Sequence, residues 1–346
     1  MAMTINTNVV SINSQRNLSL SGSSLATSMQ RLSSGLRVNS AKDDAAGLAI
    51  SERMKAQSSG LAVAARNAND GISLAQTAEG ALSKVGDMLQ RMRELAVQSA
   101  NATNSKTDRE AMQAEVKQMI NEIDRVAKTS EFNGTKLLNG SFSGAVFQVG
   151  AKAGDNITVG SIADTTAAKL GGTAEVYKKV GASVALDVAQ TEVELINKDS
   201  ATTGATAFMV KDDNADTYKV TVMAGATGTF GTTAVAVGDK QTVALSSLTV
   251  ATQADAFSAL KVIDKALDEV NTSRGALGAL QTRFEKSIEN IDIMNENISA
   301  ARGRIVDADF AAETANLSRS QILQQAGTAM VAQANQLPQN VLSLLR

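Results

Sequence analysis

Residues 263–305 read IDKALDEVNTSRGALGALQTRFEKSIENIDIMNENISAARGRI, and every seventh side chain from the first is apolar. An apolar repeat of seven residues, kept over many turns, is typical of helices that pair along a seam as in a coiled coil. A second column of the repeat is interrupted by Arg274, Gln281 and Asn295, and polar residues in a seam fix the register of the paired helices. We therefore predict a long paired helix, whose seam consists of Ile263, Val270, Leu277, Phe284, Ile291 and Ile298.

The first third of the chain carries a similar pattern. Apolar side chains recur every seven residues after Ser40 and Asp43, which have the spacing of a helix-capping box. The pattern predicts a helix over about 43–100, which at 1.5 Å per residue would be roughly 85 Å long. A further helix is predicted from Thr107, with Glu110 as its reciprocal cap. Helices of this length indicate a rod.

The two ends of the chain are amphipathic but almost uncharged. Their polar faces consist of Gln, Asn, Ser and Thr, and residues 1–41 contain no acidic residue. Since solvated surface helices normally carry charge, we expect both ends to be packed against other helices. Pro338 is expected to kink or interrupt the last helix. The apolar positions of the two patterns are Leu25, Met29, Leu32, Leu36, Met330, Leu337, Val341 and Leu344.

Between the helical regions the composition changes to Gly, Thr, Ala and Val. Tyr218, Val220 and Val222 alternate with other residues, as do Val235 and Val237, and Gly-Asp and Ala-Gly turn signals lie between them. This pattern predicts short antiparallel strands. The predicted fold class is therefore mainly α, with long antiparallel helices from both ends of the chain and a small β-rich insertion between them.

The composition excludes several functional classes. The 346 residues include no cysteine and no histidine, which excludes disulfides, thiolate nucleophiles, serine triads and most metal sites. The net charge of −2 gives no electrostatic reason to expect nucleic-acid binding. No apolar run approaches the ~20 residues needed to cross a bilayer, and the N-terminus lacks the pattern of a secretory signal peptide. We expect no catalytic site, cofactor, metal, nucleic-acid partner or membrane partner.

Five segments of the chain are recognisable together. They are the start MAMTINTNVVSINSQRNL, QRLSSGLRVNSAKDDAAGLAIS (30–51), QRMRELAVQSAN (90–101), EFNGTKLLNG (131–140) and the ending LPQNVLSLLR. These five segments resemble bacterial flagellin. The resemblance covers about 1–165 and 250–346. It implies a structural protein without catalysis, a self-assembling subunit that polymerises into the flagellar filament for motility.

The resemblance also implies three domains. Residues 1–42 and 303–346 would form a terminal coiled-coil domain at the filament core, with the apolar positions of both ends as its polymerisation seam. Residues 43–175 and 251–302 would form a helical rod that carries a β-hairpin drawn from FQVGAKAGDNITVG. Residues 176–250 would form the variable β-rich outer domain.

Partners and location follow from the same resemblance. The implied location is extracellular, in the flagellar filament, because flagellins are secreted without a cleaved signal peptide. The implied partners are further copies of the chain, an export chaperone, the filament cap and hook-associated proteins. The resemblance also implies that the chain acts on animal innate immunity, with a host flagellin receptor as a partner. The matching receptor-binding residues are Gln90, Arg91, Glu94, Leu95, Val97 and Glu115. Since Arg91 and Leu95 lie four residues apart, we expect their side chains to share one helix face.

The sequence is also compatible with other interpretations. The charged residues around Arg91 could equally form a solvated face or a contact between subunits, and both roles can hold in a polymer. A hook–filament junction protein shares the same terminal pattern. An adhesin or a filament-borne enzyme could use the middle domain, although the absence of His and Cys disfavours an enzyme.

Overall fold

The computed structural model of the chain describes residues 8–171, 174–184, 193, 206–211, 218–224 and 240–344. The chain divides into two compact units. The first comprises Met1–Ala65, Gly150–Ala153 and Glu289–Arg346, and the second comprises Arg66–Val149 and Gly154–Ile288. These boundaries differ from those of the three predicted domains, so the three-domain division stays a prediction.

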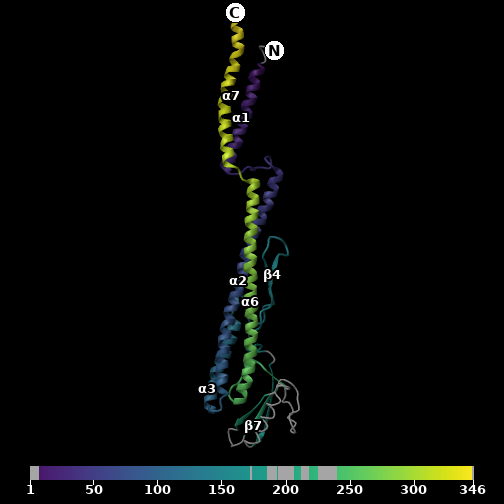
Figure 1. The fold of residues 1–346 in the computed structure, drawn as a ribbon, viewed down its shortest axis with the longest axis vertical. Coiled ribbons are helices and arrows are strands. Elements are labelled where there is room, and N and C mark those ends of the chain that lie inside the picture. The colour runs from purple at the N-terminus through teal and green to yellow at the C-terminus, as the bar shows by residue number, and fades with distance from the viewer. Residues whose placement is uncertain are drawn as a thin grey trace. The chain divides into compact units, whose positions relative to one another are not determined.

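Long helices account for most of the described residues (Figure 1). They are α1 (Val9–Ser34), α2 (Ala45–Ser99), α3 (Lys106–Thr129), α6 (Gln253–Val306) and α7 (Phe310–Leu344), with a short 3₁₀ turn, η1 (Leu245–Ser247). The two longest, α2 with 55 residues and α6 with 54, confirm the helices predicted from the seven-residue repeats. The single proline of the chain, Pro338, lies outside both helices, so no proline interrupts their backbone hydrogen bonds.

The strands form three antiparallel groups. β1 (Glu131–Phe132) pairs with β2 (Thr135–Lys136), and β3 (Ala145–Gln148) pairs with β4 (Asn156–Val159). The third group is a sheet in the order β6-β7-β5-β8, formed by β5 (Ala174–Val184), β6 (Thr206–Lys211), β7 (Tyr218–Ala224) and β8 (Lys240–Val243).

These strands confirm the predicted β-rich insertion and the predicted fold class. The hairpin expected from FQVGAKAGDNITVG is β3–β4, in which Ala145 lies opposite Val159. The strand expected around Val220 is β7, whereas Val235 and Val237 lie outside the described residues.

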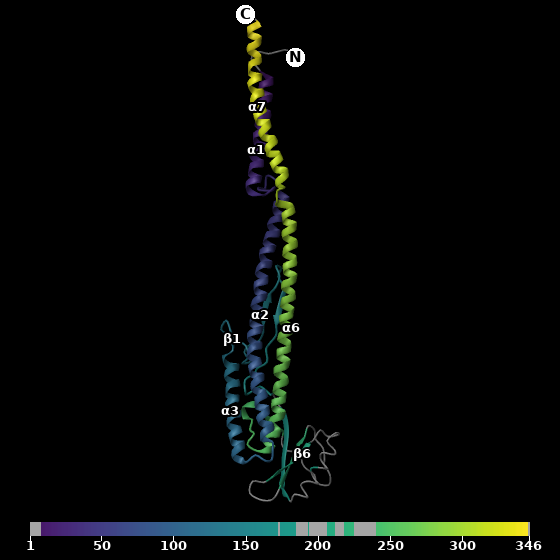
Figure 2. The ribbon, with the colours of Figure 1, turned by 60° about the vertical axis from the view of Figure 1, so that its left-hand side comes forward.

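The apolar core of the second unit is formed mainly by α2, α3 and α6 (Figure 2). Gly71 on α2 lets the ring of Phe284 on α6 approach closely, since a Cβ placed on Gly71 would lie 2.6 Å from the Phe284 Cζ. Phe147 on β3 meets the same ring edge-on, with the ring centroids 5.6 Å apart. This aromatic pair attaches the hairpin to the helices. Within this unit, the buried positions that follow the repeat on α2 are Ala68, Ala75, Leu82, Leu89 and Ala96.

In the first unit, α1 and α7 lie side by side (Figure 1). α1 ends at Ser34 and is capped by Gly35, whose φ of 71° is the left-handed conformation that glycine adopts at helix ends. The next residue, Leu36, pairs with Asp307 in an antiparallel bridge, so the α1–α2 and α6–α7 linkers contact each other. α7 continues through Pro338, so the predicted interruption is wrong, and the alternative of a kink stays a prediction. Proline has no amide hydrogen to donate to the carbonyl four residues before it, and the Ala334 carbonyl accepts from the Asn8 side chain instead.

The start of α2 differs from the prediction. The helix begins at Ala45, and its cap is Asp44 rather than Ser40. The Asp44 Oδ1 accepts a hydrogen bond of 2.8 Å from the Gly47 amide, which satisfies one of the free donors of the first turn. The Ser40–Asp43 pair instead closes a turn before the helix.

The start of α3 also differs by a few residues. The capping box is formed by Ser105 and Asp108, not by Thr107 and Glu110. The Ser105 Oγ accepts from the Asp108 amide at 3.2 Å, and the Asp108 carboxylate accepts from the Ser105 amide at 3.0 Å. Both pairs have the capping-box spacing, so the pattern alone does not choose between them.

Candidate assembly and recognition surfaces

The contact between α1 and α7 is made largely of small and polar side chains. The Ser11 hydroxyl donates a hydrogen bond of 2.7 Å to the Asn335 Oδ1. The Asn8 side-chain amide donates one of 2.8 Å to the Ala334 carbonyl. The buried side chains on these two helices are Ser11, Ser28, Glu313, Ser320 and Ala334. The fully buried part of the contact is therefore small or polar, while its leucines are only half-buried.

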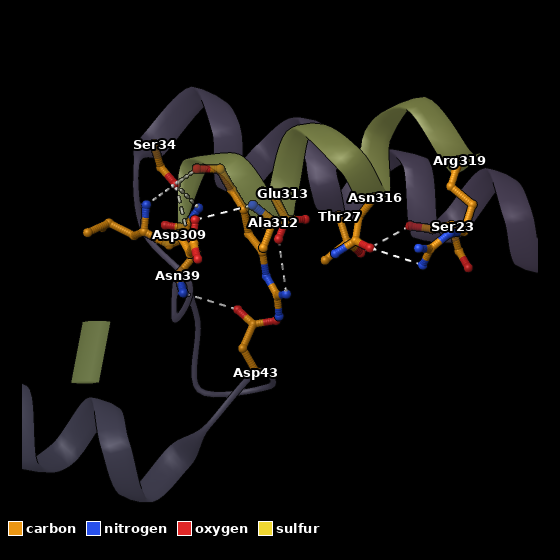
Figure 3. Close-up of polar contacts among 12 residues, drawn as sticks. Ser23, Thr27, Ser34, Asn39, Asp43, Asp309, Ala312, Glu313, Asn316 and Arg319 are labelled. Atoms are coloured by element: carbon orange, nitrogen blue, oxygen red, sulfur yellow. Dashed lines mark hydrogen bonds and ion pairs between the residues drawn. The ribbon is translucent and has the colours of Figure 1, made fainter. Parts of the chain in front are cut away.

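An ion pair also joins these two helices. The Arg31 Nη1 lies 3.9 Å from the Glu313 Oε2, and the Glu313 side chain is only 10% exposed. The Arg31 Nε is buried without a hydrogen-bond partner. A groove beside the pair is lined by both helices, including Thr27 of α1 with Asn316 and Arg319 of α7 (Figure 3). A buried carboxylate thus lies in a contact that otherwise contains neutral polar groups.

Arg37 covers the end of α6. Its Nη2 donates hydrogen bonds to the carbonyls of Ile305, at 2.6 Å, and Arg304, at 3.3 Å. Its backbone amide donates to the Val306 carbonyl at 2.7 Å. These carbonyls belong to the last turn of the helix, where no intrahelical donor remains for them.

Asp43 organises the linker that precedes α2. Its Oδ2 accepts hydrogen bonds from the Ser40 amide (2.9 Å) and the Ser40 hydroxyl (3.0 Å). It also accepts one from the Asn39 amide (3.2 Å), which Figure 3 shows. The Ser40 hydroxyl is the main cause that lowers the pKa of Asp43, followed by the two amides, and the charge of Arg31 adds a smaller effect. The linker is therefore held best when this carboxylate is ionised.

The predicted polymerisation seam contains half-buried and exposed side chains. The half-buried members are Leu25, Leu32 and Leu36, and the exposed members are Met29 and Met330. Leu337, Val341 and Leu344 belong to α7, but their side chains lie outside what the structure describes.

A second set of exposed apolar side chains on the same helices lies outside the predicted seam. Its members are Val9, Val10, Ile12, Leu20, Phe310, Ile322 and Leu323. Leu323 and Met330 are seven residues apart and so share a face of α7, a spacing that is visible in the sequence. Most of the exposed large apolar side chains among the described residues thus lie on α1 and α7.

The predicted seam of α6 faces the other helices. Its members Ile263, Val270, Leu277, Phe284 and Ile291 are buried, and Ile298 is half-buried. Polar residues of the neighbouring column connect α6 with α2. The Gln281 Nε2 donates to the Glu79 Oε2 at 2.7 Å, and the Ser58 hydroxyl donates to the Asn295 Oδ1 at 2.6 Å.

The residues predicted to bind a receptor lie on α2 and α3, and all are exposed except Leu95. The exposed ones are Gln90, Arg91, Glu94, Val97 and Glu115. Leu95 is 2% exposed and belongs to the apolar core of the second unit. The expectation that its side chain shares the exposed face of Arg91 is therefore wrong. Positions four apart on a helix are offset by about 40°, enough for one to face solvent and the next to turn inward.

Ion pairs hold the exposed face in place. The Arg91 Nη1 donates to Glu94 at 2.9 Å and its Nη2 to Glu115 on α3 at 3.1 Å, and both carboxylates raise the pKa of Arg91, Glu94 most. Arg93, outside the predicted set, donates to Asp264 on α6 at 2.6 Å. A shallow depression in this face is lined by Gln90, Arg93, Glu94, Val97 and Gln98.

Two negative findings apply to the described residues. They contain no group of three or more acidic side chains placed to hold a metal ion. Their helices are nowhere both long enough and apolar enough for a membrane span.

Two family models match the chain. The model described as the bacterial flagellin N-terminal helical region matches residues 5–143, and the one described as the C-terminal helical region matches residues 260–345. Flagellin D of Vibrio anguillarum is 41% identical over 376 residues, with all of both chains covered.

Solved structures are more distant. FliC from Burkholderia pseudomallei is 25% identical with a TM-score of 0.42, and the match covers 62% of this chain and 99% of that one. A putative flagellar hook-associated protein from Vibrio parahaemolyticus is 13% identical with a TM-score of 0.49, covering 77% of this chain and 100% of that one.

Proposed function

Because this chain belongs to the bacterial flagellin family and is a structural subunit of the extracellular flagellar filament, we propose that α1 and α7 form the surface through which its copies polymerise. The observation that carries the proposal is the concentration of exposed apolar side chains on these two helices. Covering apolar surface stabilises an assembly by roughly 25 cal/mol per Å². Contiguous exposed apolar surface is also typical of protein–protein contacts.

The polar contact between α1 and α7 supports the same proposal. The fully buried side chains of their contact are small or polar, and the large apolar side chains that remain exposed on both helices are left for other molecules to cover. The nearly uncharged polar faces of both helices let several copies pack around them without strong repulsion. The predicted seam residues and the second exposed set would both be covered in the polymer.

The test uses two substitutions on α7, Ile322→Ser and Met330→Ser. The control is Val146→Ser on β3, where the side chain is 65% exposed, the same as Ile322. Sedimentation over a series of protein concentrations measures the concentration needed for polymerisation, and circular dichroism measures helix content. We expect both α7 variants to raise that concentration without loss of helix, while the control behaves as the parent. Unchanged polymerisation of both α7 variants would refute the proposal.

We further propose the three-domain division of residues 1–42 with 303–346, 43–175 with 251–302, and 176–250. It is supported by the helix ends at Ser34 and Val306, which lie near two of the boundaries. Limited proteolysis tests it: the first cuts should fall near these boundaries. The buried residues of the α6 seam would then hold the middle domain together.

We also propose that the exposed face around Arg91 is recognised by a host flagellin receptor. The proposal is supported by the exposure of Gln90, Glu94 and Val97 and by the ion pairs that fix Arg91. Leu95 would support this face from beneath rather than contact the receptor.

Membership of the family supports polymerisation and association with hook-associated proteins. Beyond this we propose export without a cleaved signal peptide, an export chaperone, contact with the filament cap, and no catalytic role. A hook–filament junction protein has less support, since the relative that matches over its full length at 41% identity is a flagellin. An adhesin would use residues 176–250, most of which lie outside the described residues.

A further inference from the structure

We propose that the ion pair between Arg31 and Glu313, here called the key, forms within one chain. It fixes which helix α1 pairs with and in which register. The inference rests on the proposed role of α1 and α7 in polymerisation. In an assembly that brings many copies of both helices together, each α1 has to select the α7 of its own chain.

Charge is scarce on these helices. The charged side chains of α1 are Arg16 and Arg31, and those of α7 are Glu313 and Arg319. Glu313 is therefore the sole carboxylate on either helix. Serine and asparagine contacts can form in several registers, but Arg31 meets this carboxylate in only one.

Burial makes the pair selective. The Glu313 side chain is only 10% exposed, while that of Arg31 is 31% exposed. A carboxylate that loses water without gaining a cation is strongly destabilised, so registers that separate the pair are disfavoured. A single buried polar group has a similar role in coiled coils, where it sets register and partner number.

The contacts along α1 agree on one register. Ser11 meets Asn335 at one end, and Arg31 meets Glu313 at the other. Between them, Leu18 packs against Gly327. Moving α7 by one turn would break all of these contacts together.

Asp43 is the other carboxylate that acts on Arg31. Its Oδ2 already accepts three hydrogen bonds from Asn39 and Ser40, and no ion pair joins it to Arg31 in the described part of the chain. Glu313 is therefore the carboxylate that selects the helix partner.

An engineered disulfide can report the register of α1 against α7. The chain contains no cysteine, so no native thiol would interfere. A Cβ placed on Gly327 would lie 3.7 Å from the Leu18 Cβ, and disulfides need Cβ atoms about 3.5–4.5 Å apart. The double variant Leu18→Cys/Gly327→Cys should thus form a disulfide within one chain. A non-reducing gel separates this product from a dimer linked between chains.

In this background we compare Arg31→Glu, Glu313→Arg and the exchanged pair that carries both changes. The control is Arg319→Glu, an equal change of charge on α7 at a residue whose guanidinium contacts Asn316. Each single reversal should lower the yield of the intrachain disulfide about tenfold, because it places two like charges in the contact. The exchanged pair should recover most of the yield, and the control should keep it.

Several results would overturn the key. Unchanged yields in both single reversals, or an exchanged pair no better than they are, would show that the charges do not set the register. A parent background without the intrachain disulfide would refute the register itself. A dimer band in place of the intrachain product, from the disulfide background with the original charges, would show that the pair forms between chains.

The disulfide is measured in dilute and in concentrated protein, with sedimentation in parallel. If the exchanged pair recovers the disulfide but Ile322→Ser and Met330→Ser polymerise normally, the proposed polymerisation surface fails and the key stands. If those variants lose polymerisation while the charge reversals leave the disulfide unchanged, the surface stands and the key fails.

Discussion

The Ser58 hydroxyl on α2 donates a hydrogen bond of 2.6 Å to the Asn295 Oδ1 on α6, inside a seam that is otherwise largely apolar. We expect Asn295→Leu to change the free energy of unfolding by no more than about 1 kcal/mol, because a neutral hydrogen bond has a small net value and leucine adds apolar contact. The variant should still weaken the register of the two helices, since a polar seam residue excludes competing alignments.

Thermal denaturation and electron microscopy check this prediction. Asn295→Leu should melt close to the parent and give filaments that are fewer or altered in shape. Ser58→Ala/Asn295→Leu is the control, since it also removes the unpaired hydroxyl. A large loss of stability in the single variant, not relieved in the double variant, would contradict the register role.

Ile291 and Ile293 provide a matched pair on α6. Ile291 is 4% exposed and packs with Leu61 and Ala64, whereas Ile293 is 58% exposed. Ile291→Asp places an unpaired carboxylate in this seam and should lower the free energy of unfolding by about 3–5 kcal/mol. Ile293→Asp should change it by less than about 0.5 kcal/mol. Equal melting temperatures for the two variants would show that the seam is wrongly assigned.

The helical seams could be predicted from the sequence because the repeat extends over many turns. Each added turn reduces the number of helix faces on which all apolar residues of the repeat can lie. Ile263 and Phe284 can therefore be placed on one side of α6. Helix starts depend on a few atoms instead. Ser105 and Thr107 offer alternative caps two residues apart, and only the structure shows that Ser105 is used.

The surface residues are harder to predict from the sequence for a different reason. The spacing places Leu95 on the same face as Arg91, but the exact rotation of α2 turns Leu95 into the core. The contact between Ser11 and Asn335 joins residues that are 324 positions apart, and nothing local in either helix identifies the other. Which apolar side of α1 stays open depends on that pairing, so Leu20 and Ile322 could not be placed from spacing alone.

Alanine substitutions at Gly71 and Gly80, both on α2, are expected to change stability in opposite directions. Alanine usually stabilises a helix relative to glycine by about 1 kcal/mol. At Gly80 nothing lies within 4 Å of an added Cβ, so Gly80→Ala should raise the melting temperature. At Gly71 the added Cβ would lie 2.6 Å from the Phe284 ring, which is held on another side by Phe147. Gly71→Ala should therefore destabilise the second unit by about 1–3 kcal/mol. Stabilisation by both substitutions would show that Phe284 can move freely.

Asp43 should make the linker before α2 sensitive to acid. Hydrogen bonds from Ser40 and Asn39 lower its folded-state pKa below the ordinary value of 3.8. A carboxylate with a lowered folded-state pKa stabilises the fold above its unfolded pKa and loses that effect as the pH falls through the folded value. The loss should therefore begin below about pH 4 and be complete only below the folded-state pKa.

Hydrogen-exchange protection of the Asn39 and Ser40 amides measures this loss directly. The protection should fall on acidification in the parent and be lower, with less dependence on pH, in Asp43→Asn. Asp70→Asn, at an exposed carboxylate on α2, serves as the control and should follow the parent. Protection that stays constant down to about pH 2 would contradict the role of the Asp43 carboxylate.

Arg91 and Leu95 separate receptor contact from support of the fold. Arg91 is exposed and makes ion pairs of a kind worth about 0–1 kcal/mol, so Arg91→Ala should leave the melting temperature nearly unchanged while it weakens receptor signalling. Leu95→Ala removes a buried side chain and should lower the free energy of unfolding by about 2–5 kcal/mol. Lys84→Ala, on an exposed part of α2, should alter neither property. Cell-based signalling assays and thermal denaturation on the same preparations distinguish the roles. If Arg91→Ala signals as strongly as the parent, the receptor does not use this face; if Leu95→Ala melts as the parent does, its side chain is not part of the core.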